Sequence, residues 1–193
     1  MLRMSGRITL VRHGRSAHVH SGWLSHAAFL RWREEYEAAG IDPTDTPPSD
    51  LTTLAAGSGV VVASTAPRAV ASAKSLSSAP ILTTPLLREL DLRPPRIAWI
   101  RLPLPGWALT LGVQSLLRGG SLHRPVIAKR EQVRAQEAAA WLIALAKEHG
   151  SVLAVTHASF RSVLAEALRS SGWQSDSSRR SSHWSAWSFV SRD

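Results

Sequence analysis

The chain has 193 residues, no cysteine and a formal net charge of +9 that comes almost wholly from arginine. This length can bury the core of one domain, and the lack of cysteine excludes disulfides and thiolate-ligated zinc sites. No segment reaches the roughly 20 apolar residues of a membrane helix, and the first residues lack the apolar core of a secretory signal, so we expect a cytoplasmic protein without membrane contact.

Apolar strand-like segments and helical segments alternate through the first half of the sequence. Branched apolar runs bounded by polar residues are typical of buried strands, and Ser, Pro and Gly mark the expected helix ends. In chain order we expect a strand at 7–12, an amphipathic helix at 25–39, a short helix at 51–57, a strand at 59–65, a helix that begins at Pro67, and a strand near Ile81 and Leu82.

The second half begins with a segment that breaks this alternation. Residues 92–125 contain prolines, an apolar patch and glycines, and we interpret them as an insertion near the active site of a single domain spanning 1–193. The expected elements beyond it are a helix at 129–148, a strand at 151–157, a helix at 158–172 and a closing strand at 183–192. The whole pattern predicts an α/β three-layer sandwich, a mainly parallel sheet with helices on both faces.

Polar residues follow three of the expected strands. Arg12, His13 and Gly14 come directly after the first strand, Arg68 follows the second, and His157 ends the fourth. Because ligand sites of such sheets lie at the carboxyl ends of the strands, we expect these side chains to converge there.

Three motifs carry a resemblance to a known family. The sequences VRHGRS, STAPRAVASA and VTHASF, which contain His13, Arg68 and His157, resemble the signature segments of the histidine phosphatase (phosphoglycerate mutase-like) superfamily in order and in topology. The resemblance implies a phosphoglycerate mutase-like fold and a metal-independent phosphomonoesterase that acts through a phosphohistidine intermediate.

The resemblance also implies roles for individual residues. His13 would be the nucleophile, and Arg12, Gly14, Arg68 and His157 would bind the phosphate, with His157 also stabilising charge in the transition state. Glu89 in LLREL stands at the family's usual position for the residue that donates and accepts the proton. Asp91, two residues on, is the competing candidate for that role.

The sequence departs from the family in two places, which leaves other functions open. DLRPPR follows Glu89 where members have a segment with glycine and tryptophan, and Val19 stands near the position of an asparagine that touches phosphate in many members. The alternatives are a phosphoglycerate mutase-type phosphotransferase, a phosphohistidine protein phosphatase, and a phosphate-binding regulatory module with impaired catalysis.

Other features of the sequence bear on partners and cofactors. The arginine excess also suits nucleic acid, but the arginines are scattered and no nucleic-acid-binding motif is present, so we expect a small phosphorylated substrate instead. His18, His20 and His26 lack the carboxylates and spacing of a metal site, so we expect no metal and no cofactor. Trp99 and Trp107 could line a substrate cleft or bind a partner, but packing of the insertion on the domain is the simpler interpretation. No sequence feature indicates an oligomeric state.

Overall fold

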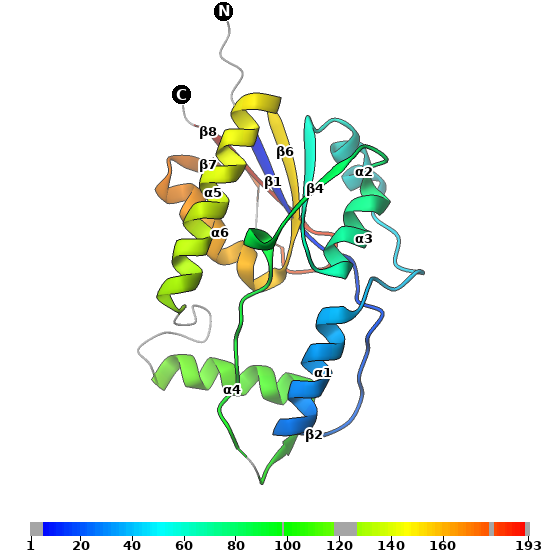
Figure 1. Cartoon of the computed structure of the whole chain (residues 1–193), viewed down its shortest axis with the longest axis vertical. Coiled ribbons are helices and arrows are strands. Elements are labelled where there is room, and N and C mark those ends of the chain that lie inside the picture. Colours follow the sequence, from blue (N-terminus) through cyan, green and yellow to red (C-terminus); the bar gives the residue numbers. More distant parts are fainter. Residues whose placement is uncertain (1–5, 98, 118–126, 178–179, 192–193) are drawn as a thin grey trace, which may run out of the picture.

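A six-stranded sheet forms the centre of the molecule (Figure 1). The structure, a computed structural model, describes residues 6–97, 99–117, 127–177 and 180–191. The strand order is β4-β3-β6-β1-β8-β7, with β1, β3, β4 and β6 parallel and β8 and β7 antiparallel. Their bounds are Arg7–Arg12 (β1), Val60–Ser64 (β3), Ile81–Thr84 (β4), Ser151–Thr156 (β6), Trp173–Ser175 (β7) and Ala186–Ser191 (β8).

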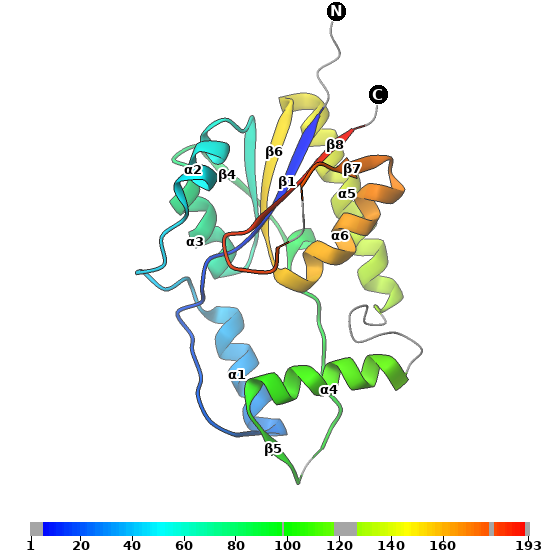
Figure 2. The same ribbon diagram turned by 180° about the vertical axis from the view of Figure 1, so that it is seen from behind.

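Helices cover both faces of this sheet (Figures 1 and 2). On one face α5 (Lys129–His149) and α6 (Ala158–Ser170) enclose a large apolar core, and on the other α2 (Ser49–Ala56) and α3 (Pro67–Leu76) enclose a smaller one. Successive residues of β1 point to opposite faces, as the pleat of a strand requires, so Leu10 enters the first core and Val11 the second. The predicted three-layer α/β sandwich is thereby confirmed.

Local sequence signals fix several helix ends. The Ser25 hydroxyl accepts a hydrogen bond from the Ala28 amide at the start of α1 (His26–Ala38). Pro67 occupies the first turn of α3, where its missing N–H leaves no bond unmade. Gly150 follows α5 with φ of +77°, a conformation that favours glycine. No helix within the described ranges is long and apolar enough to span a membrane.

A small group of elements lies beyond the carboxyl ends of β1, β3 and β6 (Figures 1 and 2). We call it the cap: β2 (Leu24–Ser25), α1, β5 (Arg101–Leu102) and α4 (Leu104–Leu117). Its core contains Trp107, which has 0% exposed surface, stacks on Phe29 at 5.4 Å between ring centroids and donates its indole N–H to the Leu24 carbonyl at 3.0 Å. Trp107 therefore packs the cap, whereas Trp99 is 87% exposed. Residue 98 and residues 118–125 of the predicted insertion lie outside the described residues.

The structure corrects the sequence-based expectation at the C-terminal strand. The strand was predicted from residue 183, but β8 begins at Ala186, because Trp184 adopts φ of +59° and turns the chain before the strand starts. The short strands β2, β5 and β7 were not predicted. The 3-10 helix η1 (Pro85–Leu87) follows β4 directly and carries the chain to Glu89.

Trp107→Ala is expected to destabilise the cap by about 3–5 kcal/mol, because it removes the largest buried side chain of a small core. Hydrogen exchange of the α4 amides should accelerate while the sheet amides stay protected. Trp99→Ala is the matched control and should leave the exchange rates of the α4 amides and of the sheet amides unchanged. Unaltered α4 protection in Trp107→Ala would show that this packing does not hold the cap.

Candidate active site

Three predicted residues meet at the carboxyl edge of the sheet. Arg12 of β1 pairs with Thr156 of β6, so His13 and His157 leave adjacent strands side by side, with their rings 5.0 Å apart. Arg68 lies between them, donating from Nε to His13 Nε2 at 3.3 Å and from Nη2 to His157 Nδ1 at 3.2 Å. All three side chains are almost completely buried.

Hydrogen bonding determines which ring nitrogen of His13 carries the proton. Nδ1 lies 2.7 Å from the Gly14 carbonyl oxygen, which can only accept, so we assign the proton to Nδ1 and the lone pair to Nε2. Burial and the nearby Arg68 and Arg12 cations lower the pKa of His13 from 6.5 to about 3. The side chain is therefore a neutral imidazole at physiological pH, with its free nitrogen facing a cation.

His157 is held in a complementary way. Its Nδ1 accepts from Arg68, and its Nε2 lies 3.0 Å from the Ser64 hydroxyl at the end of β3. Burial and the Arg68 cation hold the pKa of His157 well below its ordinary value, so this ring too is neutral. Because a hydroxyl can donate as well as accept, Ser64 permits the opposite tautomer, in which Nδ1 would donate to a bound anion.

Arg12 is a second cation beside His13. Its Nη1 donates to the Ser181 carbonyl, while its Nε is buried without a hydrogen-bond partner among the described residues. A buried donor of this kind is costly unless something accepts from it. An anion bound next to the His13 ring would supply such an acceptor.

Arg68 is neutralised by the cap. Its Nη2 forms an ion pair with Glu37 Oε1 at 2.9 Å, its Nη1 donates to the Tyr36 carbonyl at 3.1 Å, and its guanidinium carbon lies 4.5 Å from the centre of the Tyr36 ring. Arg88 approaches the other Glu37 oxygen at 4.0 Å. The Glu37 carboxylate, in the last turn of α1, thus pairs with the Arg68 guanidinium, which is the cation that a bound anion would need.

Glu89 is a half-buried residue whose carboxyl group is held by backbone amides. Its oxygens accept from the amides of Leu90 (3.0 Å), Phe160 (2.8 Å) and Ser159 (3.3 Å), the last two at the start of α6. Burial raises the pKa of Glu89 above its ordinary value of 4.5, although these bonds oppose the change. Such a group can hold a proton closer to neutral pH than an exposed carboxyl can.

Asp91, the competing candidate, has a different environment. It accepts from Arg33 at 3.2 Å, Arg93 at 3.3 Å and Arg130 at 3.2 Å. A carboxylate with three arginine partners stays ionised and is a poor proton donor.

Gly14 has a steric role in the structure. A Cβ at this position would lie 2.4 Å from the Trp184 ring, so only glycine lets the chain pass beneath that ring. Its N–H donates to the Ser72 hydroxyl at 2.9 Å, and its carbonyl holds His13. Its predicted contact with phosphate would need this N–H, which Ser72 now engages.

Sequence reasoning missed Glu37, Ser64 and His183. The His183 ring lies 5.8 Å from the His13 ring, because β8 pairs with β1 and brings the turn before it to the site. Val19, at the position of the family's asparagine, is 76% exposed. Within the described ranges, no group of three or more His, Asp or Glu side chains is placed to hold a metal ion.

Solved structures share this fold. Phosphoserine phosphatase from Entamoeba histolytica, a His-to-Ala mutant in complex with phosphoserine, matches with a TM-score of 0.55 and 12% identity over 96% of this chain and 91% of that chain. Mycobacterial glucosyl-3-phosphoglycerate phosphatase in complex with VO3 matches with a TM-score of 0.52 and 16% identity, covering 84% and 81%. A structure described as mycobacterial hydrolase 1 matches with a TM-score of 0.53 and 19% identity, covering 84% and 78%.

These neighbours are members of the histidine phosphatase superfamily. With identities this low, the likeness establishes the fold, which is phosphoglycerate mutase-like as the three motifs predicted. No protein-family model and no curated protein sequence matches the chain.

Glu37→Gln is expected to tighten the binding of inorganic phosphate by roughly threefold to tenfold, because a partly exposed charge interaction is worth about 1 kcal/mol. Isothermal titration calorimetry measures the change. Glu34→Gln removes the same charge from an exposed position of the same helix and should leave the affinity unchanged. Weaker binding in Glu37→Gln alone would show instead that Glu37 orients Arg68 for the anion.

His13 is expected to remain neutral far below pH 6.5. NMR of the protein labelled with ¹⁵N-histidine should show an unprotonated Nε2 from pH 8 down to about pH 4, with His13→Asn providing the assignment. Since the folded pKa is lowered, this group contributes stability that is full above pH 6.5 and lost as the pH falls toward 3. A titration centred near pH 6.5 in the folded protein would contradict the assignment.

Proposed function

We propose that this chain is a metal-independent phosphomonoester hydrolase that works through a phosphohistidine on His13. The observation that carries the proposal is the neutral His13 imidazole, whose Nε2 lone pair faces the buried Arg68 guanidinium. A nucleophile and a cation at one point are what phosphoryl transfer requires. The fold, shared with phosphatases, supports the same activity.

In the first step, the phosphoryl group of the substrate enters between His13 and the two arginines. The Nε2 lone pair forms a bond to phosphorus while the bond from phosphorus to the ester oxygen breaks. The Arg68 N–H that now bonds His13 turns to a phosphate oxygen, and Arg12 Nε donates to another. In the tautomer that carries its proton on Nδ1 and accepts from the Ser64 hydroxyl at Nε2, His157 donates to a third oxygen.

Proton transfer in both steps falls to Glu89. Its raised pKa lets it give a proton to the leaving alkoxide. The resulting carboxylate then takes a proton from water, the hydroxide oxygen attacks phosphorus, and the bond to Nε2 breaks. Inorganic phosphate forms, and His13 and Glu89 return to their starting states.

The test is the release of inorganic phosphate from a panel of phosphomonoesters in excess chelator, with wild type, His13→Ala, Glu89→Gln and Asp91→Asn. We expect His13→Ala to abolish turnover and Glu89→Gln to lower kcat by about 10²–10⁴-fold, the usual contribution of a general acid. Asp91→Asn is the matched control for loss of a neighbouring carboxylate and should retain most of the kcat.

Other outcomes would favour the mutase, the binding module or Asp91 as the acid. Transfer of the phosphoryl group to a sugar-acid hydroxyl in preference to water would identify a mutase. Tight phosphate binding with no turnover of any ester by folded wild type would contradict the hydrolase and favour a binding module. A larger loss in Asp91→Asn than in Glu89→Gln would reverse the assignment of the acid.

A further inference from the structure

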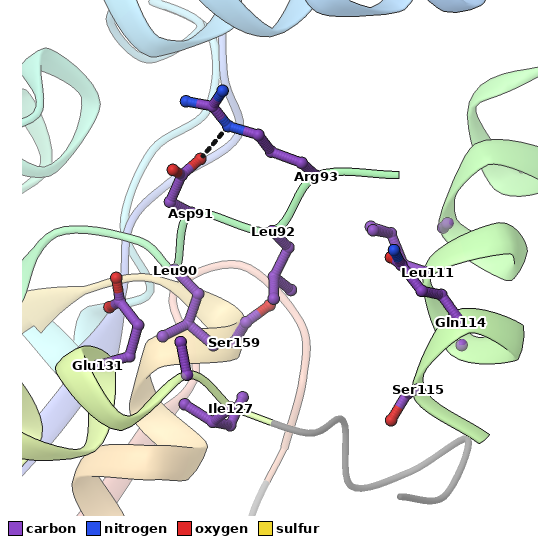
Figure 3. A pocket seen from close by; sticks show the side chains of 13 residues that line it. Leu90, Asp91, Leu92, Arg93, Leu111, Gln114, Ser115, Ile127, Glu131 and Ser159 are labelled. Atoms are coloured by element: carbon purple, nitrogen blue, oxygen red, sulfur yellow. Dashed lines mark hydrogen bonds and ion pairs between the residues drawn. The ribbon is translucent and has the colours of Figure 1, made fainter. Parts of the chain in front are cut away.

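We infer that a cavity beside Glu89 receives the alcohol part of the ester and selects an apolar, uncharged group. The inference rests on the proposed hydrolase and names its substrate class. The cavity has a volume of about 410 Å³ and lies between α4 of the cap and the segment that follows Glu89 (Figure 3). This volume falls in the range of small-molecule sites.

The position of the cavity follows from the chemistry of the leaving group. A general acid must lie within hydrogen-bond reach of the oxygen that it protonates, so the ester oxygen lies at Glu89 and the rest of the alcohol extends from there. Leu90 and Ser159 both line the cavity. The Leu90 amide donates a hydrogen bond to one carboxyl oxygen of Glu89, and the Ser159 amide donates to the other. The cavity therefore begins at the two residues whose amides hold the Glu89 carboxyl group. Glu89 itself and the residues proposed to bind the phosphate do not line it, so the leaving group would enter past Leu90 and Ser159.

Aliphatic side chains form much of the wall. Figure 3 shows Leu111 on α4 across the cavity from the segment that bears Leu90 and Leu92, with Ile127 at the side near the start of α5. Contact with these side chains removes apolar surface of a ligand from water, which is favourable in proportion to the area removed. A hydrocarbon leaving group gains this free energy, and a strongly hydrated one does not.

The charged groups of the cavity already have partners. Asp91 bonds Arg93 within the cavity and two further arginines outside it, and Glu131 forms ion pairs with Arg134 and with Arg130, the latter at 3.6 Å. Arg93 is largely exposed, so water screens its charge. A carboxylate or ammonium group on the substrate would lose its hydration in the cavity without a dedicated counter-ion.

The experiment compares esters with similar leaving alcohols, so that chemical reactivity does not decide the result. The substrates are 2-phenylethyl phosphate, ethyl phosphate, phosphoserine and 3-phosphoglycerate. We expect kcat/KM for 2-phenylethyl phosphate to exceed that for each of the other three by about tenfold or more, the usual discrimination of an apolar pocket.

Variants of α4 test whether the cavity is the cause. Leu111→Asp places a charge in the wall, and Leu111→Trp fills the space. Each should lower kcat/KM for 2-phenylethyl phosphate by about tenfold and leave that for ethyl phosphate within about twofold. Leu109→Asp makes the same change on the same helix, at a side chain that is 61% exposed and outside the cavity. It should leave kcat/KM for both substrates unchanged.

Ethyl phosphate also reports the folded, active fraction, so a folding defect would lower both rates together. A preference of wild type for phosphoserine or 3-phosphoglycerate would overturn the inference while leaving the hydrolase intact. Equal losses for both esters in both Leu111 variants, with circular dichroism showing the same folded fraction as wild type, would overturn it as well. Failure to cleave any ester would overturn the hydrolase and this inference with it.

Discussion

The buried guanidinium of Arg68 is the constraint on which the site depends. A charge with no exposed surface must have partners, and Arg68 finds them on three separate parts of the chain: the ends of β1 and β6, which carry His13 and His157, and the last turn of α1, which carries Glu37. The sheet supplies the two imidazoles as acceptors, and the cap supplies the carboxylate. The same cation thus organises the nucleophile and links the cap to the sheet.

Burial shifts the pKa values of the two titratable groups of the proposed reaction in opposite directions. It lowers the pKa of His13, which keeps a lone pair on Nε2, and raises that of Glu89, which favours a retained proton. Desolvation disfavours the charged form of each, so one environment prepares a base and an acid. The same burial makes Arg12 Nε, which has no partner in the described part of the chain, a ready donor to an anion.

Much of this arrangement could be predicted from the sequence, because it rests on local signals. The apolar runs before His13 and His157 identified two strands, and Pro67 identified the start of α3. The parallel order of the strands implied the convergence. Glu37 and His183 could not be found in this way. Glu37 reaches Arg68 through the packing of α1, and His183 depends on the positive φ of Trp184 and on the pairing of β8 with β1, which are tertiary features without a local pattern.

In the proposed reaction, His13 carries the phosphoryl group between the ester and water. The most direct measurement is rapid quenching of the turning-over enzyme into alkali, which preserves phosphohistidine, followed by mass spectrometry of its peptides. We expect phosphate on the peptide that contains His13, appearing before free phosphate and absent in His13→Ala. Phosphate on another residue, or product formation in the first turnover with no phosphoenzyme, would contradict it.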